Sequence, residues 1–409
     1  MYNQLKSRES GRPNQATANR KGAIVVLAAV ILVVIMAFTA FTVDVGYITV
    51  TKAELEKSAD GSAMGAALEL TDGLGPQATK TISEVDTLAR NAAVAVASAN
   101  RGGGLDSVAA DGDRDVRFGQ VVWNAGTNSW SKTWGASPYN LVEVTLRRSE
   151  ATDAQGNPNT GGDRPLSLFF APVIGHSQAS VSAASLSALI AGSGFKVAGG
   201  SGMTAGVLPI ALDEQTWDAL VIDQLAGTSG QFSDNHYYND TTGAVSTGSD
   251  GKFEINLYPE GNTVLPPGNR GTVDFGSSSN STSDLSRQIV YGLNENDLSY
   301  FGGEIKASHA APLIVNGDTG ISAGMKDELE SIIGEPRAIP IFSEVNGPGN
   351  NAMYTIVQFV GIRIMKVKLT GNPKYVRIQM APFSEQTVTW DGTETIQDSY
   401  IFSAPTLIR

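Results

Sequence analysis

The sequence has 409 residues, with 29 Lys and Arg against 41 Asp and Glu, a formal net charge of −12, and no cysteine. The lack of cysteine excludes disulfides, thiol nucleophiles, cysteine-ligated zinc and a lipidated cysteine anchor. The acidic balance argues against a nucleic-acid partner, because binding to phosphates requires an excess of Lys and Arg.

One apolar run, from Gly22 to Val43, contains no charged residue. As an α-helix rising ~1.5 Å per residue it reaches ~33 Å, which is enough for a hydrocarbon core of ~30 Å. The run is longer than the apolar part of a signal peptide, and no Ala-x-Ala cleavage site follows it. The sequence therefore predicts a membrane-spanning helix over residues 22–43.

The charges before this run predict its orientation. Five basic residues precede it and only Glu9 opposes them: Lys6, Arg8, Arg12, Arg20 and Lys21. Basic flanks are held on the cytoplasmic side of a membrane. We expect a single pass through the membrane, with residues 1–21 as a cytoplasmic basic leader and the chain from Asp44 onward extracytoplasmic.

The helical pattern continues beyond the predicted span. Leu55, Ala59, Ala63 and Ala66 recur at spacings of three and four, so they share one helical face. Small residues on such a face allow close helix packing. Two interpretations stay open, namely a stalk that packs with copies of itself or with partners, and a helix that lies on its own domain. A second helix is expected over residues 82–96.

From Asp115 onward the pattern of apolar residues alternates, which predicts strands. They are expected at 116–123, 141–148, 166–170 and 179–190, and a Gly-rich linker follows at 192–206. The region 207–409 is expected to be mainly β, with strands at 339–345, 354–360, 362–369, 375–380 and 387–390. It contains one clear helix, 323–333, capped by Ser322. The predicted fold class is α+β, with a long helix on an antiparallel sheet followed by a β-rich extracytoplasmic domain.

Three motifs mark the apolar run and its flanks. The run begins as Arg20-Lys-Gly-Ala-Ile-Val-Val-Leu27, ends in Asp44-Val-Gly-Tyr47, and is followed by Leu55-Glu-Lys-Ser-Ala-Asp-Gly-Ser-Ala63. These motifs resemble those of the TadE/TadG-like proteins of the Flp (tight adherence) pilus-assembly system. The resemblance covers residues 20–70 and extends to the strands at 115–119 and 140–148. It implies that residues 44–191 form a pilin-like domain. It also implies a non-enzymatic minor pilin or assembly factor without a cofactor, whose partners are the inner membrane and other pilus-assembly proteins.

The start of the run resembles a prepilin leader boundary. Such leaders end in Gly, and Gly22 is followed by Ala23. Pilins carry Glu five residues after the Gly, where this chain has Leu27. This departure favours an anchor for assembly over a subunit of the filament shaft. A surface adhesin or ligand-binding module on the same anchor is the alternative function, and an anchored hydrolase is a third.

A hydrolase motif is present but lacks its partners. Gly320-Ile-Ser-Ala-Gly324 matches the GxSxG nucleophile pattern, in which the catalytic histidine follows the serine. His176, His236 and His309 all precede Ser322. Helix capping by Ser322 explains the same residues better, so we predict no catalytic residue.

Three alternating aspartates, Asp111, Asp113 and Asp115, resemble the start of a calcium loop. Such a loop also needs Gly at its sixth position and Glu at its twelfth. The chain has Val116 and Val122 there, so a solvated acidic loop is favoured and no metal site is predicted.

Five basic residues gather around one predicted hairpin in the acidic second half: Arg363, Lys366, Lys368, Lys374 and Arg377. Strand alternation can place several of them on one face. The favoured interpretation is a solvated face with cross-strand ion pairs. The alternative is a docking patch for an acidic partner.

Overall fold

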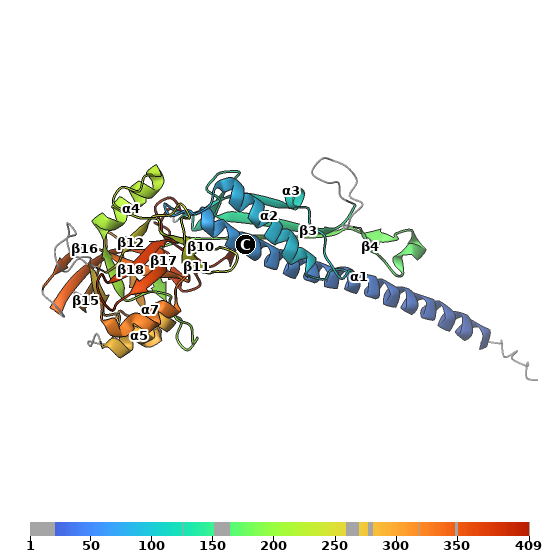
Figure 1. Ribbon diagram of the computed structural model, residues 1–409. Helices are drawn as coiled ribbons and strands as arrows, with labels where there is room; N and C mark the ends of the chain where they lie inside the picture. The colour runs from blue at the N-terminus through green and yellow to red at the C-terminus, as the bar shows by residue number, and fades with distance from the viewer. Residues whose placement is uncertain are drawn as a thin grey trace, which may run out of the picture.

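The computed structural model describes residues 21–124, 126–150, 164–258, 270–276, 281–318, 320–347 and 351–408. Figure 1 shows an elongated molecule in which one long helix projects from a β-rich body. The helix lies on a first sheet, and a second β-rich region, with a small barrel, lies at the opposite end of the molecule. The predicted α+β fold class is confirmed.

The long helix, α1, spans Lys21–Leu70 without a break. From Ile24 to Val43 its side chains are exposed, apart from half-buried Ala40. Beyond Asp44 it buries one face, and the apolar residues of this face join the first hydrophobic core. A short 3-10 helix, Thr71–Gly73, ends it.

The second helix, α2, spans Ile82–Ser98 and lies against α1. Thr81 and Glu84 form a capping box at its start, which supplies partners to backbone N–H groups that the first helical turn leaves free. Close packing with α1 depends on glycine, since a Cβ on Gly65 would lie 3.1 Å from Val96 Cγ2. A short helix, α3 (Gly112–Asp115), follows.

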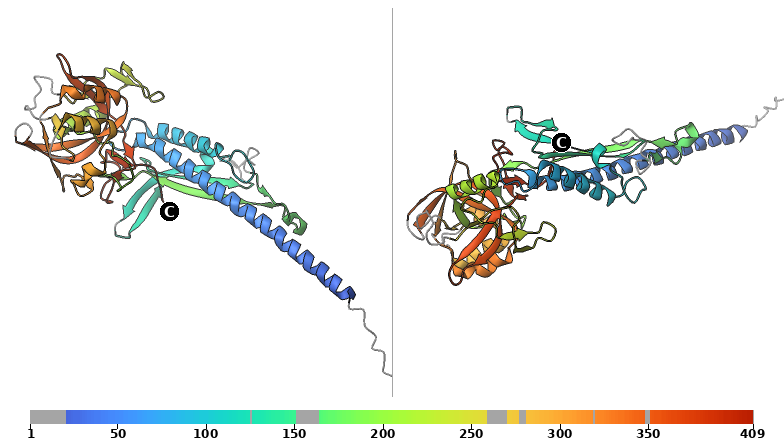
Figure 2. Two further views of the ribbon diagram at one scale, coloured as in Figure 1. Left: turned by 90° about the horizontal axis from the view of Figure 1, so that it is seen from below. Right: turned by 45° about the horizontal axis from the view of Figure 1, so that its top comes forward.

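The first sheet is antiparallel and has the strand order β2-β1-β3-β6-β22. The strands are β1 (Val116–Asn124), β2 (Ser129–Trp134), β3 (Leu141–Arg148), β6 (Val181–Ala188) and β22 (Thr406–Leu407). The second half of α1 packs on β3 and β6, as Figure 2 shows. The alternating apolar residues of these strands face α1, which explains why the sheet buries only one face there.

A separate hairpin extends beside α1. It consists of β4 (Leu166–Ser167), the 3-10 helix η2 (Ala171–Ile174) and β5 (Gln178–Ala179). The strand predicted at 166–170 is therefore shorter, because the chain turns into η2. The strand predicted at 179–190 divides into β5 and β6.

The second region contains a closed ring of five strands in the order β9-β13-β15-β17-β16, which closes where β16 pairs with β9. They are β9 (Ile210–Asp213), β13 (Arg270–Val273), β15 (Leu313–Asp318), β16 (Pro336–Asn346) and β17 (Ala352–Lys368). Strands β18 (Tyr375–Met380) and β12 (Glu254–Asn256) continue the sheet from β17. Apolar side chains inside and around this ring form two further cores.

The two strands predicted at 354–360 and 362–369 are one strand, β17. Gly361 does not interrupt it. A Cβ at Gly361 would lie 2.3 Å from the carbonyl oxygen of Ala381, so glycine allows a close backbone approach there. The irregularity in the strand comes later, as a register shift against β18 between Ile364 and Lys366.

Several helices pack on the ring: α4 (Glu214–Ala226), α5 (Thr282–Tyr291), α6 (Glu295–Ser299) and α7 (Lys326–Ser331). The helix predicted at 323–333 is a 3-10 turn, Ala323–Met325, followed by α7. Ser322 Oγ accepts a hydrogen bond from the Gly324 N–H at 3.2 Å, so its predicted capping role is confirmed.

The domain boundary expected in the Gly-rich segment 192–206 remains a prediction. In this segment β7 (Ala191–Gly192) pairs with β21 (Ile401–Ser403). The next strand, β8 (Gly194–Lys196), lies between β14 (Glu304–Lys306) and β20 (Val388–Thr389). The end of the chain then returns to the first sheet through β22.

Candidate functional site at the end of the apolar helix segment

Asp44 is the first charged residue after the apolar run, and it is 3% exposed. Its carboxylate accepts backbone hydrogen bonds from Phe169 (2.8 Å), Phe170 (3.0 Å) and Ala171 (2.6 Å). Burial alone raises the pKa of this carboxyl, but the three N–H donors outweigh it and hold the pKa of Asp44 below its usual value. The ionised carboxylate thus ties the β4–β5 hairpin to α1.

Tyr47 lies one turn further along α1 and joins two segments to it. Its hydroxyl donates to the carbonyl oxygen of Gly103 at 2.9 Å. Its ring lies 5.2 Å from the ring of Phe169, centroid to centroid. Gly103 has φ +56°, and a Cβ there would lie 2.7 Å from Thr51 Cγ2, so the loop needs glycine to approach α1 this closely.

Arg148, at the end of β3, completes the site and is 5% exposed. Its guanidinium donates to the carbonyl oxygens of Arg164 (2.7 Å), Gly102 (2.8 Å) and Gly103 (2.6 Å). Burial lowers the pKa of Arg148. Glu54 Oε2 on α1 accepts from the Gly103 N–H at 2.7 Å. The 102–103 loop is therefore bonded to α1 on one side and, through Arg148, to β3 on the other.

The sequence places Asp44 and Tyr47 in one motif but does not indicate their partners. Arg148 appeared only as the end of an alternating strand. One feature of the sequence could have indicated that Arg148 is buried: it stands at a position where the alternation of β3 predicts a buried side chain. The loop glycines and the hairpin carry no such signal.

The other predicted anchor residues lie in the first turns of α1. Gly22 and Ala23 lie in the helical backbone, and Leu27 is 60% exposed. Within the described residues, α1 is the one helix long and apolar enough to cross a membrane. The anchor role of Gly22, Ala23, Leu27 and Asp44 stays a prediction.

The predicted packing face of α1 lies inside the molecule. Leu55, Ala59, Ala63 and Ala66 are all 0% exposed, within the core formed with α2 and the first sheet. This arrangement corresponds to the interpretation in which the helix lies on its own domain. These four side chains are inaccessible to a second copy or to a partner.

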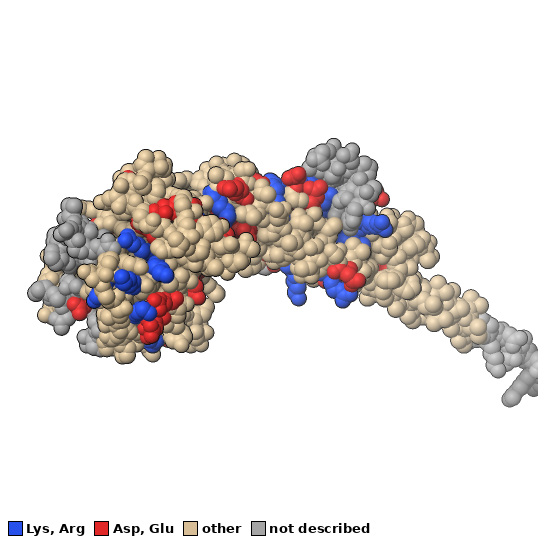
Figure 3. All heavy atoms as spheres, in the orientation of Figure 1, with Lys and Arg blue, Asp and Glu red and all other residues tan. Residues whose placement is uncertain are grey.

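The predicted basic cluster divides into two parts. Arg363 is 7% exposed; its Nε donates to the Gly334 carbonyl oxygen at 2.9 Å and its guanidinium lies 3.4 Å from the Tyr238 ring centroid. Arg363 is therefore not part of an exposed patch, because the Gly334 carbonyl oxygen and the Tyr238 ring cover its guanidinium. Lys366 is exposed, and Lys368, Lys374 and Arg377 are half-buried. Figure 3 shows basic side chains over β17 and β18, beside acidic side chains over α7.

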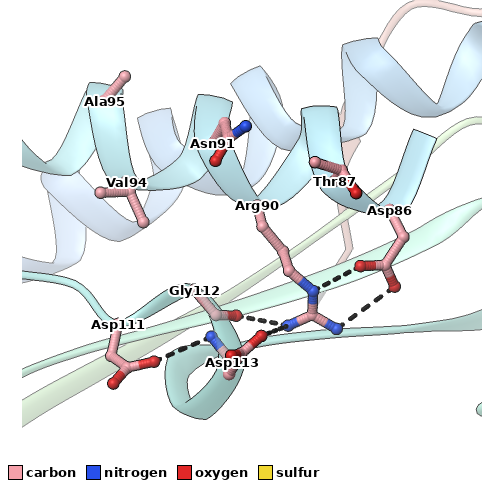
Figure 4. Close-up of a pocket in the computed structure, with 9 residues that line it drawn as sticks. All are labelled: Asp86, Thr87, Arg90, Asn91, Val94, Ala95, Asp111, Gly112 and Asp113. Carbon is pink, nitrogen blue, oxygen red and sulfur yellow. Dashed lines mark hydrogen bonds and ion pairs between the residues drawn. The ribbon is translucent and has the colours of Figure 1, made fainter. Parts of the chain in front are cut away.

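The acidic segment 111–115 lies beside a pocket between α2 and α3, shown in Figure 4. Asp111 caps α3 by accepting from the N–H groups of Asp113 and Arg114, and Asp115 pairs with Arg114 and Arg147. Arg90 pairs with Asp86 one turn away on α2 and reaches across the pocket to the carbonyl oxygen of Gly112. In the part of the chain that is described, no group of three His, Asp or Glu side chains is arranged to hold a metal ion.

Comparison with known families identifies the region around this site. Residues 22–69 match the family model Tad, described as Flp pilus-assembly TadE/G-like. This match covers the apolar segment, the Asp44–Tyr47 motif and the buried face of α1. The search of curated proteins and the search of solved structures each found no match.

Proposed function

We propose, from the Tad domain at residues 22–69, that this protein is a membrane-anchored component of Flp pilus biogenesis. The first half of α1 spans the inner membrane with its amino end in the cytoplasm. The remainder lies outside and acts through protein contacts, as a minor pilin or assembly factor. The supporting observation is that one unbroken helix changes at Asp44 from exposed apolar side chains to a buried packing face.

The exposed half of α1 supports a membrane span on physical grounds. Large apolar side chains cover it all round, with Ile24 67% exposed, Val33 66% and Phe41 62%. A soluble surface rarely carries so large a continuous apolar area. An α-helix satisfies its own backbone hydrogen bonds, which a span in hydrocarbon requires.

The described residues support a mechanical role. Ser322 is occupied as a helix cap. Ser322 Oγ accepts from the Gly324 N–H, and within the described residues no hydrogen bond joins it to His236, which pairs with Glu254, or to His309, which pairs with Glu214. The chain would then act by positioning its extracytoplasmic surface relative to the membrane.

Retention in the membrane is the finer part of the proposal. Leu27 keeps the span apolar where pilins carry the glutamate. The test is determination of the mature amino terminus, combined with fractionation into membrane and sheared-filament pools. We expect an intact terminus and recovery in the membrane pool. A terminus at Ala23 together with recovery in sheared filaments would identify a processed shaft subunit instead.

A further inference from the structure

The hairpin beside α1 has an uncharged, apolar tip. Residues 165–180 contain no Lys, Arg, Asp or Glu. Four large apolar side chains within six residues are exposed: Phe169 (63%), Phe170 (46%), Val173 (89%) and Ile174 (71%). Isolated exposed apolar residues are ordinary, but a cluster at the tip of a projecting hairpin needs a partner surface.

The tip is held beside the apolar half of α1. Asp44 binds the N–H groups of Phe169, Phe170 and Ala171, and Tyr47 contacts the Phe169 ring. Figures 1 and 2 show the hairpin running along α1 toward its projecting end. The tip therefore lies beside the end of the apolar half of α1, where Phe41 and Val43 are exposed.

The backbone N–H groups of the tip have hydrogen-bond partners. Besides the three N–H groups bound by Asp44, Val173 donates to Phe170, Gly175 to Pro172 and His176 to Ala171. Residue 172 is a proline and has no N–H group to satisfy. An unpaired backbone N–H group costs free energy in lipid, so these hydrogen bonds lower the cost of placing the tip at the bilayer surface.

We propose that the segment Phe169–Ile174 inserts into the extracytoplasmic leaflet of the bilayer beside α1, as a second membrane contact. This inference rests on the proposed membrane span. Lipid, not a protein partner, is favoured because the apolar tip continues the apolar surface of α1 and carries no charge that would select a partner. The two Phe rings at the level of the span's end fit the apolar side of a segment that lies in the membrane interface.

A second contact would restrict the orientation of the protein relative to the membrane. A single helix can rotate about its axis and change its tilt, since these are set by interfacial anchors and neighbouring helices. The tip contacts the bilayer on one side of α1 only. Rotation of α1 would pull it out of lipid, so the outer sheets would face a defined direction.

The experiment uses the full-length protein in vesicles of phosphatidylethanolamine and phosphatidylglycerol. Because the chain has no cysteine, single variants can each carry one environment-sensitive fluorophore. Ile174→Cys and Val173→Cys report on the tip. Val34→Cys reports on the span, and Leu225→Cys on α4, which is as exposed as Ile174 at 71%, is the matched control.

We expect quenchers attached high on the lipid chains to quench the probes at 173 and 174, and aqueous iodide to leave them unaffected. The probe at 225 should show the opposite behaviour. Iodide quenching at 173 and 174 with lipid quenching at 34 would overturn this inference and leave the span intact. Protection of the tip that appears only after other pilus components are added would also overturn it. Iodide quenching at 34 would refute the span and the inference together.

Discussion

The carboxylate of Asp44 accepts a hydrogen bond from the backbone N–H of Phe169 at 2.8 Å, across 125 residues of sequence. This contact joins the end of the apolar helix segment to the hairpin that follows the first strands. It explains physically why an acidic residue follows the apolar run. The carboxylate supplies several acceptor positions to a turn that would otherwise leave backbone donors unpaired.

Asp44→Asn should loosen the hairpin without unfolding the molecule. The amide has one acceptor oxygen, and its NH2 group would face backbone donors. We expect hydrogen exchange at the amides of 169–171 to become about tenfold faster or more. Exchange mass spectrometry of the full chain in detergent measures this. Asp106→Asn is the control, because the Asp106 side chain is 88% exposed; equal rates in both variants would contradict the role of Asp44.

The pH dependence of this contact follows from the lowered pKa of Asp44. A carboxyl whose pKa is lower in the folded state stabilises that state above its unfolded pKa of about 4. This stabilisation by Asp44 is lost as the pH falls through the pKa of Asp44 in the folded state. Protection at 169–171, corrected for intrinsic exchange, should thus be equal at pH 7 and pH 5.

Arg148→Lys should reduce the free energy of unfolding by about 1–3 kcal/mol. A lysine lacks the planar fork that reaches three carbonyl oxygens, and at least one buried acceptor would lose its donor. Chemical unfolding in detergent, followed by circular dichroism, measures the change. Arg101→Lys should stay within about 0.5 kcal/mol, since the Arg101 side chain is 78% exposed. Wild-type stability in Arg148→Lys would show that these bonds contribute little.

Ala63→Leu should destabilise the packing of α1 on its own domain by about 1–3 kcal/mol. Ala63 is 0% exposed in the first core, so three additional carbons would force α2 or the sheet to move. Met64→Leu, at a neighbouring position that is 40% exposed, is the matched control. If both variants unfold at the same denaturant concentration, this face of α1 is not closely packed.

Asp274→Asn should stabilise the protein at neutral pH. Burial, together with the carboxylates of Asp284 and Asp297, raises the pKa of Asp274 to about 6. The folded state then binds the Asp274 proton more tightly than the unfolded state does. The contribution of Asp274 to the free energy of unfolding is therefore full below about pH 4 and is lost as the pH rises through about 6. The variant should show a smaller loss of stability between pH 4 and 7. Asp327→Asn, whose side chain is 93% exposed, should keep the wild-type profile.

A docking surface for an acidic partner is the alternative interpretation of the basic residues over β17 and β18, of which Lys366 is exposed and Lys374 half-buried. Lys366→Glu combined with Lys374→Glu should reduce pilus assembly without lowering the melting temperature. Lys132→Glu, on the exposed strand β2, controls for the added negative charge. Normal pilus numbers with both lysines reversed would favour a solvated face with ion pairs.

The sequence alone determined the features that depend on local chemistry. The apolar run predicted the position of the first half of α1, the alternation at Leu141–Arg148 coincides with β3, and Ser322 caps a helix as expected. Each of these follows from neighbours within a few residues, because helical and strand periodicity and capping act over that range. The family resemblance around residues 20–70 rests on the same local patterns.

Only the tertiary structure decided which distant segments meet. The ring closes when β16 pairs with both β17 and β9, and the chain returns through β22 to the first sheet. The partners of Asp44 and Arg148 are backbone groups, which have the same chemistry at every residue except proline. No side-chain pattern identifies such a partner in advance, so the site at the end of the apolar segment became visible only after the hairpin and α1 were placed side by side.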